Sequence, residues 1–408
     1  MTVIATDGTK HQRVVSGMRS TGRLHLGNYH GALKNWIKLQ YKYDCFFFAA
    51  DWHALTTHYE KTLGIKNSTL NMIHDWLSAG LDPNACKLFI QSGVPEHAEL
   101  HLLLSMIAPL GLLERVPTYK DQKIKLKEKD LLTYGFLGYS VLQSADVLLY
   151  KASYVPVGED QVPHIELTRA LARRFNYLYG KEHDVIDVAE VAVSKMGKKN
   201  TRLFYNLLKT YHKTGNIEFL KKGRALLSTQ AHLSIDELER LYGFLDERGK
   251  IILPEPKPLL TCRSKFPGLD GRKMSKSYNN TIGLTESAES VEKKIKTMPT
   301  DPARVRRTDP GEPLKCPVWS FHEIYSTRKV QDWVQVGCRS VSIGCLDCKG
   351  ELLVGILSEQ KPILERAAEY QNNPSAVRII VQQGIEKARD VAKNTLSEVR
   401  SAMGISYR

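Results

Sequence analysis

The sequence has no apolar run long enough to cross a membrane. Its longest strongly apolar stretches, residues 45–50 and 100–113, are shorter than the roughly 18 residues that a transmembrane helix needs. The residues before Val14 contain no apolar segment behind a basic start, so we expect no export signal. These absences argue against a membrane protein and a secreted protein, and they favour a cytoplasmic one.

Two common nucleotide-binding patterns are also missing. None of the 28 glycines belongs to a G-x-G pattern, so the dinucleotide-binding fingerprint is absent. Gly17 and Gly22 have the spacing of a P-loop, but Arg23 and Leu24 stand where that loop needs a lysine and a metal-binding hydroxyl. A P-loop nucleotidase is therefore not expected.

Acidic residues are too few to balance the basic ones. The chain has 58 Lys and Arg against 44 Asp and Glu, a net charge of +14. Between residues 195 and 224, nine basic residues accompany one acid, Glu218. Such an excess favours a polyanionic partner, and RNA is the best candidate, although a solvated basic face explains the local charge equally well.

Cysteines are few, and their number does not suit a disulfide framework. There are seven, an odd number, and four of them fall within 33 residues: Cys316, Cys338, Cys345 and Cys348. Because thiols stay reduced in a protein that is not exported, this C-x21-C-x6-C-x2-C cluster is more plausibly a metal site than two disulfides. A [4Fe–4S] cluster, a structural Zn²⁺ and metal-free thiols all remain open at this point.

Short apolar runs alternate with helical patterns over the first 190 residues. The runs predict buried strands at 14–17, 45–50, 87–91 and 154–157, and helical periodicity falls at 31–41, 62–79 and 99–113. This alternation predicts an α/β fold, with a parallel sheet that has helices on both faces. Ligands of such a sheet bind at the carboxyl ends of its strands.

The later part of the chain is largely helical. Residues 190–254 form a basic segment in which Ser234 and Glu237 predict a capping box at the start of a helix that runs through Leu245. Three prolines, at 254, 256 and 258, then predict a linker. Helical patterns return from about residue 285.

Two motifs together suggest a nucleotide site. The first, His25-Leu26-Gly27-Asn28, opens a helix, whose free N–H groups attract an anion; Gly27 leaves room for a base, and His25 and Asn28 can donate to phosphate or ribose. The second, Lys273-Met274-Ser275-Lys276-Ser277, supplies two lysines and two hydroxyls on a loop after Gly271, suited to hold a leaving pyrophosphate. Each motif alone is weak, but the pair resembles the HIGH and KMSKS signatures of class I aminoacyl-tRNA synthetases.

A further stretch narrows the resemblance. Residues 155–161, Val-Pro-Val-Gly-Glu-Asp-Gln, and residues 144–150, Ser-Ala-Asp-Val-Leu-Leu-Tyr, resemble bacterial-type tryptophanyl-tRNA synthetases. The residues agree with this, because an ionised Asp146 only accepts hydrogen bonds and an indole N–H only donates them. A buried Asp146 would reject phenylalanine strongly, whereas it would separate tryptophan from tyrosine less well.

The resemblance implies a role for each matching position. His25, Gly27, Asn28, Gly158, Asp160, Lys273, Met274, Ser275 and Lys276 would bind ATP. Tryptophan would contact Asp146, Tyr139, Gln143, Gln161, His53, Val155 and Val15. Lys273, Ser275, Lys276 and Lys120 would act on the triphosphate together with Mg²⁺. The chain departs from the family at Ser20, Gln143 and Val15, where proline, methionine and phenylalanine are often found, so the shape of the indole pocket is the least certain feature.

The resemblance also implies an organisation and partners. Residues 1–189 would form a Rossmann-like catalytic domain, 190–254 a basic helical insertion, 255–284 the linker and KMSKS loop, and 285–408 a helical anticodon-binding domain. The enzyme would be a homodimer that joins L-tryptophan to tRNA(Trp). The cysteine run is close to that of a subset of these synthetases that carries a [4Fe–4S] cluster, with one residue fewer between its first two cysteines.

Other functions stay open on sequence grounds. Tyrosyl-tRNA synthetases share the architecture, and a small-molecule nucleotidyltransferase also uses a HIGH-like helix. A non-catalytic RNA-binding Fe–S protein would keep the cysteines but would have no use for both nucleotide motifs. The basic insertion at 190–254 is equally compatible with tRNA contact and with a simple peripheral pair of helices.

Overall fold

A computed structural model describes residues 12–20, 22–60, 62–114, 116, 133–180, 183–245, 250–260 and 266–407. Its strands form one five-stranded sheet in the order β3-β2-β1-β4-β5. The strands are β1 (Arg13–Arg19), β2 (Asp44–Ala50), β3 (Cys86–Ile90), β4 (Tyr154–Val157) and β5 (Lys257–Leu260). β1 pairs in parallel with β4, and β2 with β3. The predicted α/β class with a helical C-terminal region is confirmed.

The centre of the sheet is apolar because helices cover it. Six of the seven residues of β2 are buried, and its three consecutive phenylalanines, Phe46–Phe48, are almost fully enclosed. A strand that is buried on both faces has no polar alternation, which explains why this run reads as continuously hydrophobic. Trp36 stacks on Phe47 of β2, with 4.4 Å between ring centroids. This contact attaches helix α2 (Lys34–Leu39) to the sheet.

The chain divides into two compact units. The first contains residues 17–90 and 260–385, and the second contains residues 12–16, 91–259 and 386–408. The helical elements of the first unit are α1 (Leu26–Asn28), the π-helix η2 (Tyr29–Leu33), α2 (Lys34–Leu39), α3 (Asp51–His58), α4 (Ile65–Ala79), η5 (Lys276–Tyr278), α15 (Ala288–Thr297), η6 (Pro313–Lys315), α16 (Pro317–Tyr325), α17 (Arg328–Arg339) and α18 (Cys345–Asn372).

The second unit is also rich in helices. They are η3 (Gln91–Gly93), α5 (Glu96–Ser105), α6 (Leu110–Leu113), α8 (Tyr134–Leu137), α9 (Tyr139–Leu148), η4 (Glu159–Gln161), α10 (Val162–Tyr179), α11 (His183–Ser194), α12 (Gly197–Thr214), α13 (Glu218–Ser228) and α14 (Ile235–Leu245). The last helix of the chain, α19 (Pro374–Ala402), begins in the first unit and ends in the second.

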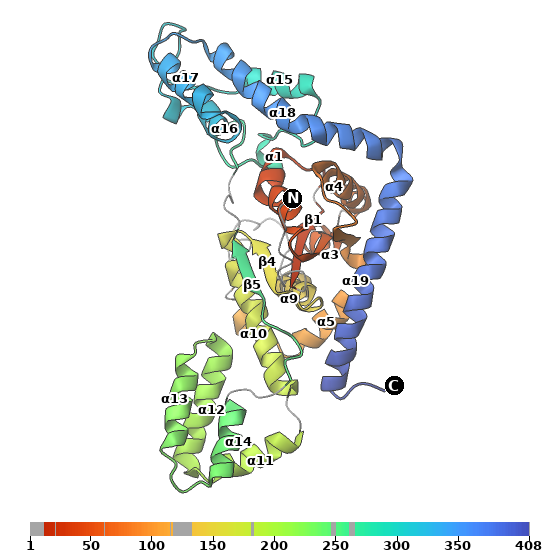
Figure 1. The fold of residues 1–408 in the computed structure, drawn as a ribbon, viewed down its shortest axis with the longest axis vertical. Helices are drawn as coiled ribbons and strands as arrows, with labels where there is room; N and C mark the ends of the chain where they lie inside the picture. The colour runs from red at the N-terminus through yellow and green to blue at the C-terminus, as the bar shows by residue number, and fades with distance from the viewer. Residues whose placement is uncertain are drawn as a thin grey trace, which may run out of the picture. The chain divides into compact units, whose positions relative to one another are not determined.

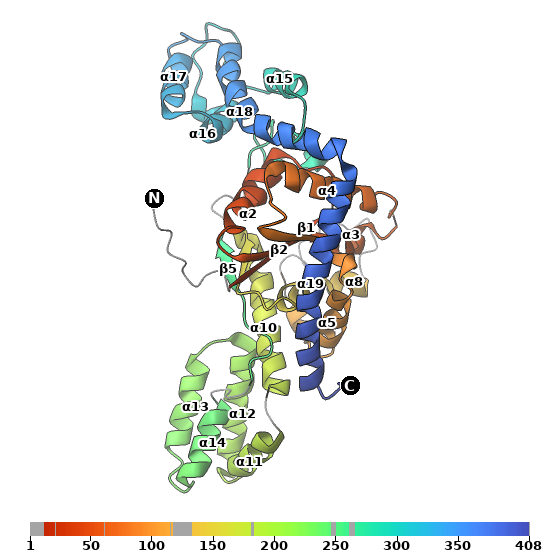
Figure 2. The ribbon, with the colours of Figure 1, turned by 45° about the vertical axis from the view of Figure 1, so that its right-hand side comes forward.

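Helix α18 holds together several parts of the first unit. Figures 1 and 2 show α16 and α17 beside its first half, and α18 also packs on α4. Gly80 ends α4 with a φ of +114°, a left-handed conformation that favours glycine. The Arg366 guanidinium of α18 donates to the carbonyls of Ser78 and Ala79 at 2.7 and 3.2 Å, so it satisfies acceptors that the end of α4 leaves free.

The basic segment after residue 190 has a hydrophobic core of its own. Helices α11 to α14 lie together in Figure 1 around buried side chains that include Phe204, Leu208, Leu241 and Phe244. The predicted capping box is confirmed: the N–H of Ser234 donates to the Glu237 carboxylate at 2.9 Å, and the N–H of Glu237 donates to Ser234 Oγ at 3.2 Å. The basic side chains therefore line the outside of a folded helical module.

The structure corrects one predicted helix and adds one strand that the sequence pattern does not predict. The helical pattern at 99–113 is two helices, α5 and α6, separated near Pro109, a residue that has no N–H to continue the first helix. The proline-rich stretch predicted as a linker contains β5, which includes Pro258. β5 lies at the edge of the sheet, where a missing backbone donor is tolerated.

Candidate active site

Residues 282–284 hold the start of α1, the first turn of the helix that continues through η2 and α2. They follow the lysine-rich loop, residues 273–277. Leu26 N–H donates to Ile282 O at 3.0 Å, and Leu284 N–H donates to Leu24 O at 2.9 Å. The backbone N–H of His25 donates to Asn28 Oδ1 at 3.1 Å. The side chain of Asn28 thus satisfies a backbone donor at the start of the helix. These bonds bring residues 24–28 and 282–284 together, although they are more than 250 positions apart.

Asn280 gives the lysine-rich loop its shape. This residue is buried, and its Oδ1 accepts the backbone N–H of Ser275 at 2.8 Å. Its Nδ2 donates to Asp270 Oδ1 at 2.7 Å and to the carbonyl of Lys273 at 3.2 Å. The loop at 273–277 is therefore fixed at its base from inside, while Ser275 and Ser277 stay on its surface with their hydroxyls 3.2 Å apart.

The two motifs line one pocket of about 460 Å³. Its walls are His25, Gly27, Asn28, Gly31, Ala32, Phe266, Lys273, Met274, Ser275, Ser277 and Tyr278. Gly27 is required here, because a Cβ at this position would lie 2.9 Å from the ring of His25 and 3.3 Å from Met274. The volume falls within the range of small-molecule sites, and the mixture of cations and hydroxyls beside a helix N-terminus suits a phosphorylated ligand.

A cluster of charges lies beside this pocket. Burial, followed by the charge of Lys276, lowers the pKa of His25 to about 4, so its imidazole is neutral near pH 7. Burial also lowers the pKa of Lys276, and the negative charge of Asp75 opposes that shift. A Cβ on Gly22 would lie 3.5 Å from Lys276 Nζ, which places the lysine against the turn before His25.

Asp75 of α4 was not anticipated from the sequence. It is fully buried, its Oδ2 accepts the N–H of Leu24 at 2.7 Å, and its Oδ1 lies 3.9 Å from Arg23 Nη1. No donor in the described residues hydrogen-bonds to Oδ1. In the sequence Asp75 reads as one more polar residue of an amphipathic helix, so no pattern identifies it.

The second unit contains a buried polar network around Asp146. Its Oδ1 accepts from Gln91 Nε2 and from His97 Nδ1, both at 2.7 Å, and His97 Nε2 lies 2.7 Å from the hydroxyl of Tyr150. All four residues are at most 1% exposed. Burial, and then the charge of Asp146, raises the pKa of Tyr150 well above its usual range, so its hydroxyl stays protonated and donates to His97.

Sequence reasoning identified Asp146 but missed its partners. Gln91 directly follows β3, at the carboxyl end of a parallel strand, which is the place where ligand-binding residues are expected. His97 lies on α5, and nothing in its local pattern separates it from an ordinary core histidine. An ionised carboxylate only accepts hydrogen bonds, so Asp146 suits a ligand that donates one.

The other predicted tryptophan contacts lie in several elements. In the second unit, Val15 and Val155 are buried in strands, Gln161 ends η4, and Tyr139 begins α9 with its ring 6.0 Å from that of His164. Gln143, one turn after Tyr139, has a buried amide oxygen with no hydrogen-bond partner among the described residues. His53 is buried on α3 of the first unit.

The remaining predicted ATP contacts are not among the residues that line this pocket. Gly158 directly follows β4, and Asp160 is on η4, both in the second unit. Asp160 accepts a hydrogen bond from Gln161 Nε2 at 3.0 Å. Lys120 lies outside the described residues.

Comparisons with known proteins identify the family. The model of class I tRNA synthetases for tryptophan and tyrosine matches residues 7–205 and 236–353. This chain belongs to that family. A tryptophan–tRNA ligase of Ralstonia nicotianae is 59% identical over 97% of this chain and 99% of its own, and one of Thermotoga maritima is 44% identical over 97% and 100%. The crystal structure of tryptophanyl-tRNA synthetase from Campylobacter jejuni complexed with ADP and tryptophan matches with a TM-score of 0.72, at 27% identity over 96% of this chain and 100% of that one.

The four clustered cysteines of this synthetase come from three helices of the first unit. Cys316 precedes α16, Cys338 lies near the end of α17, and Cys345 and Cys348 lie in the first turn of α18. Burial, and then the charges of the other three, raises the pKa of Cys348 to about 12, so the four thiols lie within electrostatic reach of one another. None of the six described cysteines forms a disulfide.

Two basic side chains approach the thiols. Arg304 Nη1 lies 3.6 Å from Cys338 Sγ, and His322 Nε2 lies 3.2 Å from Cys348 Sγ. Within the described residues, no group of three or more His, Cys, Asp or Glu side chains is arranged to hold a metal ion. Among the same residues, no helix is both long and apolar enough to span a membrane.

Proposed function

We propose that this chain joins tryptophan to tRNA in two steps. It is an aminoacyl-tRNA synthetase, a tryptophan–tRNA ligase. In the first step a carboxylate oxygen of tryptophan attacks the α-phosphorus of ATP, the bond to the β-phosphate oxygen breaks, and pyrophosphate leaves. In the second step a hydroxyl of the terminal ribose of tRNA attacks the carbonyl carbon of tryptophanyl-AMP; AMP leaves, and the hydroxyl gives up its proton.

The pocket lined by His25, Asn28 and the 273–277 loop supports the first step. The attacking carboxylate is already an anion, so no strong base is needed; the enzyme has to align the reactants and neutralise the negative charge that grows on the leaving oxygens. Lys273, Lys276 and Mg²⁺ supply positive charge, and Ser275 supplies a donor. The neutral imidazole of His25 can donate a hydrogen bond without adding a further charge beside Lys276.

The Asp146 network supports tryptophan as the amino acid. Gln91 and His97 hold one carboxylate oxygen in a fixed place, so an indole N–H would meet an acceptor that is already oriented. Gln143 presents a buried amide oxygen that receives no hydrogen bond from the described residues, and the substrate ammonium or the indole N–H would supply one. Tyr139, Gln161, His53, Val155 and Val15 complete the proposed contacts.

One experiment tests the reaction and the substrate together. ATP–pyrophosphate exchange is measured with each of the twenty amino acids. We expect exchange with tryptophan, and at most trace exchange with tyrosine and phenylalanine. Faster exchange with tyrosine would make the chain a tyrosyl-tRNA synthetase, and exchange without charging of tRNA would indicate a small-molecule nucleotidyltransferase.

The cysteine cluster fits an iron–sulfur cofactor in its donor chemistry. Four thiols from three helices lie within electrostatic reach of one another, and thiolates are the ligands of [4Fe–4S] clusters. Arg304, 3.6 Å from Cys338, offers positive charge to offset thiolates. We propose that Cys316, Cys338, Cys345 and Cys348 hold such a cluster, which orders this helical region for contact with the tRNA anticodon.

Anaerobic purification tests the cofactor. We expect a brown protein with broad visible absorbance, about four iron and four sulfide per chain, and loss of both in Cys348→Ala. Cys86→Ala is the matched control, because Cys86 is a buried thiol that lies outside the cluster. A colourless protein with one zinc per chain, or with no metal, would contradict the proposal.

An apolar surface on α5 and α6 supports a homodimer. Leu102, Met106 and Leu110 are 55, 68 and 63% exposed, which is unusual for neighbouring large apolar residues of a monomer. Sedimentation should give twice the chain mass, and Met106→Asp should shift it toward the monomer. We also propose a cytoplasmic location, where tRNA, ATP and reduced thiols occur together.

A further inference from the structure

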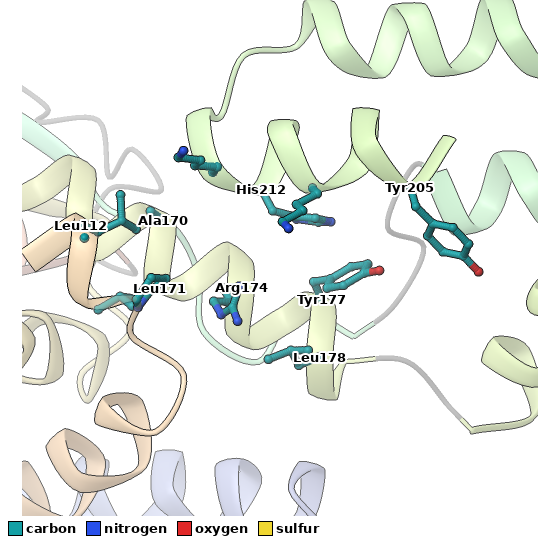
Figure 3. A pocket seen from close by; sticks show the side chains of 12 residues that line it. Leu112, Ala170, Leu171, Arg174, Tyr177, Leu178, Tyr205 and His212 are labelled. Carbon is teal, nitrogen blue, oxygen red and sulfur yellow. The ribbon is translucent and has the colours of Figure 1, made fainter. Parts of the chain in front are cut away.

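A second pocket, in the second unit, is separate from the residues described so far. It has a volume of about 620 Å³ and lies among α6, α10 and α12. Figure 3 shows Arg174 and Tyr177 of α10 beside this space, with His212 of α12 facing Tyr177. The ring centroids of Tyr177 and His212 lie 4.0 Å apart. Apolar side chains, Leu112, Leu171 and Leu178 among them, make up most of the remaining wall.

Among the described residues that line this pocket, all charged side chains are basic. They are Arg174, Lys209 and Lys213. None of the three forms an ion pair within the described part of the chain. The arginines just before Arg174 differ in this respect: Arg173 pairs with Glu255 at 2.6 Å, and Arg169 pairs with both Glu166 and Glu255. Within the described residues, two arginines of α10 are therefore neutralised, whereas the three pocket cations have no acidic partner.

Apolar walls next to free cations suit a ligand that is flat and apolar at one end and anionic at the other. A nucleotide has this character, because its base stacks on aromatic and apolar side chains while its phosphate attracts lysine and arginine. The basic surface also continues beyond the pocket, since Lys198, Lys199 and Arg202 are exposed on α12. A single carboxylate would need far less positive charge, whereas the phosphates on both sides of one nucleotide would use the three cations of the pocket.

We propose that this pocket binds an unpaired nucleotide of RNA. The base lies against Leu112, Leu178 and the tyrosine rings, and the phosphates on either side contact Arg174, Lys209 and Lys213. Given the proposed function, the RNA is the tRNA substrate. The helical module between residues 183 and 245 then contributes directly to RNA binding, together with α10, against which its helix α12 packs.

The first test compares two double variants with equal loss of charge. Lys209→Ala/Lys213→Ala removes two pocket cations, and Lys198→Ala/Lys199→Ala removes two exposed cations from the first turn of the same helix. The affinity for tRNA is measured by filter binding across a salt series. We expect the pocket variant to weaken binding at least about tenfold and to reduce the slope of log K against log salt by about 2, with a clearly smaller effect in the control.

A second variant keeps the charge and closes the space. Ala170 lines the pocket, and Ala170→Trp should fill part of it and weaken tRNA binding without changing the salt slope. Tryptophan-dependent ATP–pyrophosphate exchange, which needs no tRNA, should stay at the wild-type rate in all variants and so verifies folding. If wild-type protein shows no exchange with tryptophan, the proposed function fails; if exchange is normal and the pocket variants bind tRNA like their control, only this inference fails.

Two further ligands distinguish the source of the nucleotide. Single-stranded RNA that contains 4-thiouridine should crosslink to peptides of α10 and α12, and Ala170→Trp should abolish the crosslink. Calorimetry with uridine monophosphate should show at most weak binding. Binding of the free nucleotide with no effect on tRNA would overturn the inference, and so would a change of oligomeric state in Ala170→Trp with tRNA affinity intact.

Discussion

The carboxylate of Asp75 connects α4 to the turn before the first helix by accepting the N–H of Leu24 at 2.7 Å. It is also the negative charge that acts on Lys276, so one buried acid holds the backbone beside the nucleotide pocket and attracts a lysine of the opposite motif. Among the described residues, no cationic side chain hydrogen-bonds to Asp75 Oδ1. Arg23 Nη1 lies 3.9 Å from it.

Removal of Asp75 should therefore affect stability and ATP use together. Asp75→Ala leaves the Leu24 N–H without an acceptor, which should lower the free energy of unfolding by about 1–3 kcal/mol and raise the KM for ATP. Asp75→Asn keeps an acceptor for Leu24 but removes the charge, so it should spare more stability than it spares ATP binding. Urea unfolding and ATP–pyrophosphate exchange check this; identical behaviour of the two variants would contradict it.

Lys276→Ala should slow activation of tryptophan far more than it weakens tryptophan binding. The ammonium is proposed to stabilise charge that develops on the leaving pyrophosphate, and loss of such a group costs on the order of 100-fold in rate. Pre-steady-state formation of the adenylate gives the rate, and equilibrium dialysis gives the affinity. Lys198→Ala, on the exposed face of α12, is the control. A wild-type exchange rate in Lys276→Ala would remove this lysine from the mechanism.

The lowered pKa of His25 predicts a pH dependence of stability. Its pKa is about 4 in the folded chain, against an ordinary 6.5, so the unfolded chain binds a proton that the folded chain does not take up in this range. Stability should therefore fall as the pH drops from 6.5 toward 4. His25→Asn removes this contribution, and the difference in unfolding free energy between wild type and variant should change over that interval. A difference that stays constant from pH 7 to 4.5 would show that His25 does not titrate this way.

His97 should act on tryptophan through Asp146. His97→Ala removes one donor from the Asp146 carboxylate and leaves the Tyr150 hydroxyl without its acceptor, in a region that water does not reach. We expect kcat/KM for tryptophan to fall about 10- to 100-fold, with the KM for ATP little changed. His101→Ala, one turn further along α5, is the control. Equal loss in both variants would point to a general disturbance of α5.

Features that depend on local pattern could be predicted from the sequence. The continuous apolar run of β2, the Ser234 capping box and the helix start at His25 each follow from residues close together in the chain, and the structure has all three. β5 was missed because four residues that include a proline carry almost no strand signal. The helical periodicity on both sides of Pro109 predicts one continuous helix, whereas the structure has two.

The parts of the site that could not be predicted depend on distant contacts. Asp146 was recognisable, but Gln91 and His97 lie 55 and 49 positions away. The packing of α5 on α9 brings His97 to it, and Gln91 comes from η3, directly after β3. Asp75 is a similar case: it is an ordinary polar residue in the sequence, and it gains its role from the backbone N–H of Leu24, 51 positions away. Asn280 acts over a shorter distance, because it bonds to the backbone N–H of Ser275 in its own loop.

The π-helical turn at Tyr29–Leu33 determines how α1 is rotated about the helix axis relative to α2. A π-turn contains one residue more than an α-turn, so it rotates everything before it relative to everything after it. Deletion of Gly31, which faces open space, would restore an ordinary turn and rotate residues 26–28 by about 100° against Trp36 and Leu39. A one-residue shortening would thus leave the hydrophobic side of this helix packed on the sheet while Asn28 pointed away from the pocket that it lines.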